Sequence, residues 1–204
     1  MTLLYPTFFP NVASYMVMVQ STNLVFEIQD SYQKQTYRNR CYIYGANGKL
    51  GLNIPVHYSQ KNRQNSTKIK IDNSSNWQSI QWKSIESAYK TSPFFEFYED
   101  EFTVLFNTPK EFLIAFNFEC IEVINRCLNL EVIFTKSDQF SKSTSDLDYR
   151  FLVNARKESI INNPSYIQVF QDKYGFINNL SILDLLFNEG PNALTYLKQN
   201  PITF

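Results

Sequence analysis

The pattern of apolar residues at the start of the chain predicts a strand, a helix and a second strand. An apolar run at 3–9 is broken by Pro6, and the segment 11–21 places apolar residues on one helical face behind a potential cap, Asn11. The run 24–28 is then typical of a buried strand. If the two strands are parallel in one sheet, they form a right-handed crossover unit, and ligands of such sheets bind beyond the carboxyl ends of the strands. The segments at those ends are PTFFPN and QDSYQK.

Two alternating segments around the Asn-Gly pair at 47–48 predict a β-hairpin, because Asn-Gly is the preferred pair of a two-residue type I′ turn. Pairing Ala46 with Lys49 places Cys41 opposite Ile54. Strict alternation then predicts one core face, made of Asn39, Cys41, Ile43, Leu50, Leu52, Ile54 and Val56. The other face is predicted to be a cationic, aromatic surface made of Arg38, Arg40, Tyr42, Tyr44, Asn53 and His57.

Helical periodicity dominates from about residue 76 to residue 128. Ser92-Pro93 and Thr108-Pro109 each fit an N-cap followed by proline, and Glu111 would complete a capping box with Thr108. Further on, 130–138 and 166–176 are strand candidates, and two helices are expected at the C-terminal end, one closed by Gly190. The predicted fold is α/β or α+β, with a small mixed sheet covered by the helical segment 76–128 and by the C-terminal helices.

Composition supports one compact domain over residues 1–204, because 44% of the residues are hydrophobic and 18 Phe and 13 Tyr supply large apolar surfaces. Lys plus Arg and Asp plus Glu both number 19, so the whole molecule has no strong field toward nucleic acid or an anionic membrane. The charges are nevertheless separated: the segment 31–70 is basic without a carboxylate, and 86–122 is mainly acidic. This separation fits either an anion pocket or two surfaces that attract each other.

Three cysteines without a CxxC pair favour a reducing compartment over a disulfide scaffold. The N-terminus has no Lys or Arg before Lys34 and makes a poor signal peptide, and no apolar run is long enough to span a membrane. We therefore expect a cytoplasmic protein.

Several kinds of chemistry are disfavoured by spacing. The predicted hairpin turns Cys41 away from the only histidine, His57, and one His with scattered Cys cannot supply a zinc site. The glycines of GANGKLG lie between two strands, which does not fit a phosphate-binding loop. Nucleic acid is an unlikely partner as well, since the basic and tyrosine-rich segment 31–70 stands in a chain of zero net charge.

The cationic face of the hairpin is the candidate ligand site. Arg38 and Arg40 offer forked donors for phosphate or carboxylate, Tyr42 can stack on a base or sugar, and His57 is the one histidine, the residue type suited to proton transfer at neutral pH. The alternative is an ordinary exposed sheet face with solvated cations. The general base stays open between Glu27, Asp30, Asp148 and Asp184, besides His57.

Five segments together resemble the WbqC-like protein family: YPTFFPNVASY, SYQKQTYRNRCYIYGANG, LNIPVH, SAYKTSPFFEFY and YIQVFQDKYGFINNLSILDLLFNEGPNALTYL, spread over residues 5–197. This family takes its name from a protein encoded among O-antigen, or surface-polysaccharide, biosynthesis genes. The resemblance implies a transferase that acts on a nucleotide-linked sugar or transfers an acyl or aminoacyl group, and it implies no particular cofactor. The alternative is a non-catalytic binding or scaffolding module that recruits a pathway enzyme, and a homodimer is a further partner to test.

The resemblance also implies site residues. Those that match the family's pattern are Tyr5, Phe9, Pro10, Tyr32, Lys34, Arg38, Asn39, Arg40, Asp148, Arg150 and Asn188. We expect Lys34, Arg38 and Arg40 to hold the anionic group of a small-molecule donor and Tyr32 or Tyr42 to stack on it. Asp148 would pair with Arg150, and Asp148 and His57 are the candidate catalytic residues.

Overall fold

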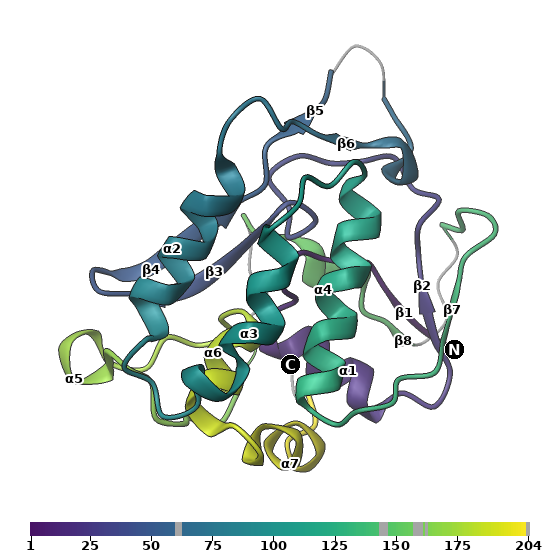
Figure 1. Ribbon diagram of the computed structural model, residues 1–204. Helices are drawn as coiled ribbons and strands as arrows, with labels where there is room; N and C mark the ends of the chain where they lie inside the picture. The colour runs from purple at the N-terminus through teal and green to yellow at the C-terminus, as the bar shows by residue number, and fades with distance from the viewer. Residues whose placement is uncertain (60–62, 143–146, 157–160, 162, 203–204) are drawn as a thin grey trace.

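The computed structural model describes residues 1–59, 63–142, 147–156, 161 and 163–202 (Figure 1). Its first sheet has four parallel strands in the order β7-β2-β1-β8. These strands are β1 (Thr2–Leu4), β2 (Leu24–Phe26), β7 (Phe134–Lys136) and β8 (Leu147–Asp148). The predicted parallel strand-helix-strand unit is therefore confirmed, and the residues after all four strands meet at one edge of the sheet.

Helix α1 (Val12–Gln20) connects β1 to β2 and is buried over most of its length. Asn11 caps it as predicted, since its Oδ1 accepts a hydrogen bond from the backbone N–H of Ser14 at 2.9 Å. A second bond from the side chain of Asn179 reaches the same turn, because Asn179 Oδ1 accepts from the backbone N–H of Ala13 at 3.0 Å. The first turn of α1 is thus tied to the C-terminal part of the chain.

The hairpin is present as β3 (Arg40–Gly45) and β4 (Gly48–Asn53), but its register differs from the predicted one by two residues. Gly45 pairs with Gly48, and Cys41 lies opposite Leu52. A type I′ turn needs two residues with positive φ, whereas only Gly48 has one here, at 95°. A shift of two residues preserves the alternation, so Cys41, Ile43, Leu52 and Ile54 still face the core, although Leu50 is exposed.

The predicted cationic face of the hairpin is a surface only in part: Asn53 and His57 are exposed, but two other members are buried. Arg38 precedes β3 and is buried, with 4% of its surface exposed, and Tyr44 is fully buried. The hydroxyl of Tyr44 donates to the carbonyls of Gly175 and Phe170, which fixes the ring inside the protein. Strand alternation alone could not show that the C-terminal segment covers this side of the hairpin.

A second antiparallel pair, β5 (Val56–His57) and β6 (Lys70–Ile71), follows the hairpin. Just before β6, the short 3₁₀ helix η1 (Ser66–Lys68) brings Ser66 against the loop after β2, where its backbone N–H bonds the carbonyl of Asp30. The mixed α and β class is confirmed, with the parallel and antiparallel strands in separate sheets.

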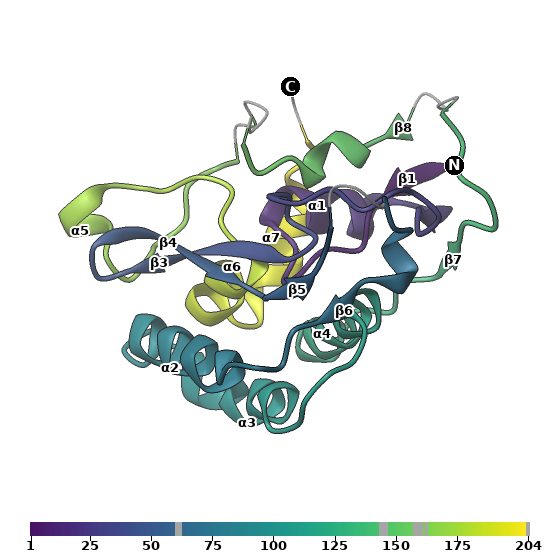
Figure 2. The same ribbon diagram turned by 90° about the horizontal axis from the view of Figure 1, so that it is seen from above.

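Three helices form the predicted covering layer: α2 (Trp77–Tyr89), α3 (Phe95–Phe106) and α4 (Leu113–Cys127). Figure 2 shows them together along one side of the molecule. Their aromatic side chains interlock, since Phe106 contacts Trp77, Trp82 and Phe116. The predicted caps are wrong. Helix α3 begins at Phe95, three residues after Ser92, and the N-cap position of α4 is taken by Phe112 and not by Thr108.

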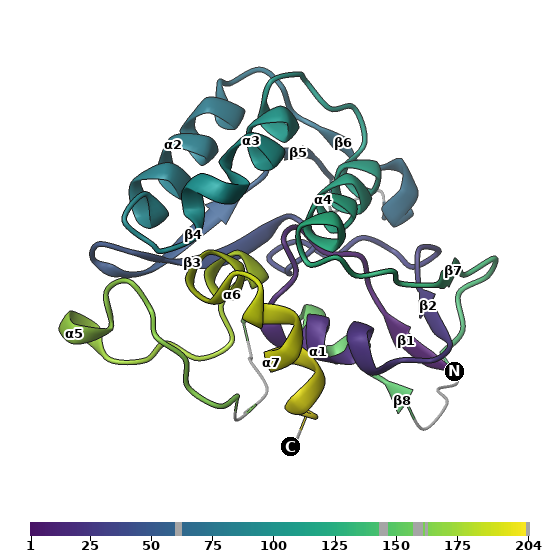
Figure 3. The ribbon, with the colours of Figure 1, turned by 60° about the horizontal axis from the view of Figure 1, so that its bottom comes forward.

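The C-terminal part contains η2 (Arg150–Val153), α5 (Gln171–Tyr174), α6 (Ile182–Glu189) and α7 (Asn192–Gln199). The described residues of the strand candidate 166–176 form no strand, and α5 occurs there instead. Helix α6 lies in the middle of the molecule, in contact with α1, α3, α7 and β3 (Figure 3). As predicted, it ends at Gly190, which has a positive φ of 51°.

Candidate functional site

Polar side chains gather beyond the carboxyl ends of the parallel strands. Tyr5 follows β1, Glu27 follows β2, Ser137 follows β7 and Arg150 lies two residues after the end of β8. The buried carboxylate of Glu27 accepts a hydrogen bond from Ser137 Oγ at 2.7 Å, and its Oε2 lies 3.7 Å from Arg150 Nη1. The edge of the sheet at which ligands are expected is therefore also where these charges meet.

Arg150 is held rigidly by the carboxylate of Asp148, as predicted for this pair. Its Nε and Nη2 donate to Asp148 at distances of 2.8 to 3.1 Å, and Nη1 donates to the carbonyl of Ser141 at 2.8 Å. Burial on its own would raise the pKa of Asp148, but the hydrogen bonds and charge of Arg150 outweigh it and lower that pKa. Asp148 is thus a stable anion whose partner is fixed in place.

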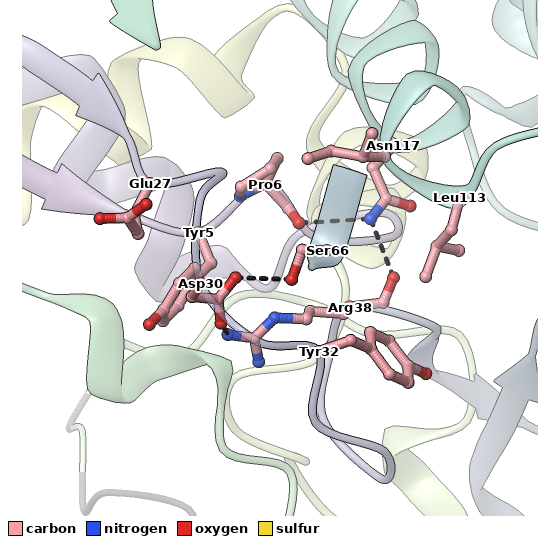
Figure 4. A pocket seen from close by; sticks show the side chains of 10 residues that line it. Tyr5, Pro6, Glu27, Asp30, Tyr32, Arg38, Ser66, Leu113 and Asn117 are labelled. Carbon is pink, nitrogen blue, oxygen red and sulfur yellow. Dashed lines mark hydrogen bonds and ion pairs between the residues drawn. The ribbon is translucent and has the colours of Figure 1, made fainter. Parts of the chain in front are cut away.

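A second buried pair joins Arg38 to Asp30 (Figure 4). Arg38 Nη2 lies 2.5 Å from Asp30 Oδ2, and Ser66 Oγ donates to Asp30 Oδ1 at 2.5 Å. The guanidinium carbon of Arg38 also lies 4.0 Å from the ring centroid of Tyr5, which is a cation–π distance. Two arginine–aspartate pairs therefore flank Tyr5, one on each side of β1.

Behind Tyr5 lies a small inner pocket with a volume of about 10 Å³, which gives room for about one water molecule. Its lining consists of Tyr5, Pro6, Glu27, Asp30, Tyr32, Arg38, Ser66, Leu113, Ile114 and Asn117 (Figure 4). Asn117 reaches in from α4 and donates to the carbonyls of Pro6 and Arg38. Burial raises the pKa of Tyr32 to about 12, and its hydroxyl has no hydrogen-bond partner among the described residues.

In front of Tyr5 and Arg38 lies a larger hollow of about 470 Å³, called here the carboxyl-end cavity. It is lined by Tyr5, Gln33, Lys34, Gln35, Thr36, Arg38, Arg150, Phe151, Val153, Asn154 and Arg156. Four of these described lining residues are cations and none is a carboxylate. Arg38 and Arg150 form the inner wall and are paired, whereas Lys34 and Arg156 are exposed and form no ion pair with any described residue. The rim is therefore suited to an anion.

The structure brings part of the predicted set together. Tyr5, Lys34, Arg38 and Arg150 line the carboxyl-end cavity, and Tyr32 lines the inner pocket beside it. Asp148 stands directly behind Arg150.

Other residues of the predicted set contact the protein core instead of either hollow. Phe9 packs against Phe8 and Phe102, and the carbonyl of Pro10 accepts the backbone N–H of Ile182. Asn39 donates to the carbonyl of Ile54, and Asn188 donates to the carbonyl of Asp184 inside α6. These contacts give all four residues structural roles.

Three further residues of that set lie along the hairpin and β5, apart from the carboxyl-end cavity. Arg40 begins β3. Lys49 Nζ lies over the ring of Tyr42, 4.4 Å from its centroid. His57 is exposed, with its Nε2 3.8 Å from Asp72 Oδ1. Of the carboxylates left open as a base, Glu27, Asp30 and Asp148 belong to the cluster at the sheet edge, whereas Asp184 is buried in α6.

Several polar members of the site were not predicted from the sequence, among them Gln33, Thr36, Ser66, Asn117, Ser137 and Arg156. The position of Ser137 near the end of the strand candidate 130–138 was a usable signal. Ser66 and Asn117 gave none, because η1 and α4 reach the sheet edge only through tertiary packing.

Cysteine and metal chemistry receive no support from the described residues. Cys41 and Cys120 are buried, and burial raises the pKa of both thiols, which keeps them protonated. No three His, Cys, Asp or Glu side chains within the described ranges are grouped as metal ligands. None of the described helices is both long and apolar enough to cross a membrane.

Comparisons with known proteins give one match. No curated protein and no solved structure matches the chain. A model of the WbqC-like protein family matches residues 5–162, a range that includes β2 to β8, η2 and all the residues that line the carboxyl-end cavity. The chain therefore belongs to the WbqC-like protein family.

Proposed function

We propose that this protein is a cytoplasmic transferase of surface-polysaccharide biosynthesis that binds an activated donor in the carboxyl-end cavity. The donor is a nucleotide-linked sugar or an acyl or aminoacyl compound, and its phosphate or carboxylate binds at the rim. Family membership supports the pathway, and the cationic lining of the cavity supports the charge of the ligand.

The observation that carries the proposal is the division of the four cations into two kinds. Arg38 and Arg150 already donate to Asp30 and Asp148, so they contribute positive potential and shape without needing a ligand. Lys34 and Arg156 have no described ionic partner and can approach an anion without breaking an ion pair. An anion bound between them gains charge-assisted hydrogen bonds at little cost.

The rest of the lining fits the remainder of such a donor. Gln33, Gln35 and Thr36 offer uncharged donors and acceptors, and Tyr5 and Phe151 offer ring faces. Asp148 remains the predicted catalytic carboxylate, although it stands behind Arg150 and its lowered pKa makes it a weak base and a better orienting group for Arg150. The catalytic role predicted for His57 stays a prediction, since His57 lies outside the lining.

Thermal unfolding with nucleotide sugars, acyl-CoA and aminoacyl donors tests this proposal. A ligand at 100 times its dissociation constant adds about 2.7 kcal/mol, which raises the midpoint by roughly 5 to 10 °C in a domain of this size. We expect one donor class to give this rise and the variant Lys34→Gln/Arg156→Gln to lose most of it.

The matched control is Lys83→Gln/Lys90→Gln, which removes one exposed cation from the middle of α2 and one from its C-cap. It lowers the net charge equally and should keep the full rise. An equal rise in the rim variant and the control would place the ligand elsewhere, and no rise with any donor would contradict the proposal.

One observation favours the alternative of a non-catalytic module: several large apolar side chains are exposed. Phe97, Ile133 and Ile167 are exposed by 78%, 79% and 71%. Exposed apolar groups mark protein interfaces when they are contiguous. A stable complex with a second copy or a pathway enzyme, measured by light scattering, together with no response to any donor, would support the module.

A further inference from the structure

A second hollow of about 560 Å³ lies in the helical layer, between the start of α2 and the loop that follows α3. We call it the helix-layer groove. Its lining consists of Asn73, Ser75, Asn76, Gln78, Ser79, Trp82, Phe106, Asn107, Thr108 and Pro109. Neither the family match nor the proposed donor site involves this groove as a ligand site.

The chemistry of the groove differs sharply from that of the carboxyl-end cavity. None of its described lining residues is charged, whereas four of the eleven around the carboxyl-end cavity are cations. Seven of its ten lining residues carry an amide or a hydroxyl, groups that both donate and accept hydrogen bonds. A ligand that matches such a surface is neutral and carries many hydroxyl groups.

Aromatic rings supply the apolar part of the groove. Trp82 is half-buried, and its ring stacks on Phe95 at an interplanar angle of 25° and contacts Phe106. These contacts fix the indole in one orientation, and its N–H donates to no acceptor among the described residues. A rigid aromatic surface with a free donor beside amides suits the C–H face and hydroxyl rim of a sugar ring.

Two lining groups are free because an expected capping role is not used. Asn76 occupies the N-cap position of α2, yet its side chain makes no capping hydrogen bond. Thr108 is in a sequence that predicts a cap, but α4 begins at Leu113 and leaves the Thr108 hydroxyl exposed. Both side chains, like that of the exposed Asn107, can bond a ligand without breaking a described hydrogen bond of their own.

We propose that the helix-layer groove binds a neutral saccharide, with Trp82 against a sugar face and Asn76, Asn107 and Thr108 on its hydroxyls. A phosphate-bearing ligand would find no cation in the described lining, and an apolar peptide would leave the amides unpaired. The inference is independent of the donor site, since no residue lines both hollows.

The test begins with a glycan array that carries neutral and acidic glycans, followed by titration of the best neutral oligosaccharide in ¹H–¹⁵N NMR. The chain has two tryptophans, so the spectrum contains two indole N–H signals. Trp77 is buried and its N–H bonds Asn73 Oδ1, whereas Trp82 lines the groove. The variant Trp82→Phe assigns the second signal by removing it, and we expect that signal to shift saturably.

The variant Asn76→Ala/Asn107→Ala should weaken binding by roughly tenfold, because each lost hydrogen bond weakens binding by roughly two- to tenfold. Neither residue makes a described side-chain hydrogen bond, so folding should be unaffected. Gln199→Ala, an exposed amide at the end of α7, is the control and should bind as the wild type does. An array that retains only acidic glycans or none, or equal affinities in the two variants, would overturn the inference.

Discussion

At the scale of single residues, the buried pair of Arg38 and Asp30 differs from the exposed cations of the rim because its substitution affects folding. Only 4% of each side chain is exposed, so both charges are compensated mainly by each other and by Ser66 and Thr36. Removal of one partner from such a pair typically costs about 3 to 5 kcal/mol. Loss of activity in an Arg38 variant would therefore report on folding as well as on ligand binding.

We predict that Arg38→Ala lowers the free energy of unfolding by about 3 to 5 kcal/mol, because it leaves the Asp30 carboxylate buried without its cation. Asp30→Asn combined with Arg38→Met leaves no charge and retains the acceptor for Ser66. Urea unfolding should show that this double variant recovers a large part of the loss. If the double variant loses as much as Asp30→Asn and Arg38→Met lose together as single variants, the pair is not coupled.

Asp184 leads to a prediction about pH. Its carboxylate accepts hydrogen bonds from Tyr89 and Tyr166 at 2.8 and 2.7 Å and from Gln168 at 2.8 Å, with no exposed surface. Burial raises its pKa from the ordinary 3.8 to about 6, and the three hydrogen bonds oppose that rise. The folded protein therefore binds a proton more tightly than the unfolded chain.

The sign follows from linkage. Stability from this group is fully present below about pH 4 and is lost as pH rises through about 6, by about 3 kcal/mol in total. We expect the wild type to gain most of that free energy relative to Asp184→Asn when urea unfolding is measured at pH 7 and then at pH 4. Parallel pH profiles of the two proteins would contradict the assignment.

At the scale of elements, the end of α6 depends on Gly190. Its φ is 51°, and a Cβ built there would lie 2.5 Å from ring atoms of Phe94. Gly48 also has a positive φ, at 95°, but a Cβ there would have no neighbour within 4 Å. An alanine at Gly48 would therefore introduce backbone strain alone, whereas an alanine at Gly190 would introduce backbone strain and steric overlap.

We predict that Gly190→Ala costs at least about 2 kcal/mol more in the free energy of unfolding than Gly48→Ala. Both variants lose about 1 kcal/mol because alanine disfavours a positive φ. Only Gly190→Ala adds a steric overlap, with the ring of Phe94 at the N-cap of α3. Chemical unfolding of the two variants measures the difference. Similar losses would mean that the Phe94 ring moves aside easily.

Local patterns predicted the elements better than their pairing. The β1-α1-β2 unit and α2 follow from apolar periodicity, and the Asn11 cap follows from residue type. The hairpin register was missed because Gly48, and not the Asn-Gly pair, supplies the positive φ. The helix starts at 95 and 113 were missed because neither α3 nor α4 begins at a side-chain cap, which was the signal that the sequence offered.

At the scale of the whole molecule, the candidate site was predictable from topology and only partly from composition. The rule that ligands bind beyond the carboxyl ends of parallel strands predicted the edge where Tyr5, Asp30 and Arg38 lie. A basic segment predicted cations but could not show which are buried in pairs. Arg38 and Lys34 are four residues apart in sequence, yet only Lys34 is available at the rim.

We propose that the rim of the carboxyl-end cavity binds the anionic group of a donor. Isothermal titration of the best stabilising donor into the wild type, Lys34→Gln/Arg156→Gln and Lys83→Gln/Lys90→Gln, each at low and high salt, tests this role of the rim. We predict at least about tenfold weaker binding and a smaller salt dependence in the rim variant alone, since it loses two charge-assisted contacts. Equal affinity of the rim variant and the control would contradict the claim.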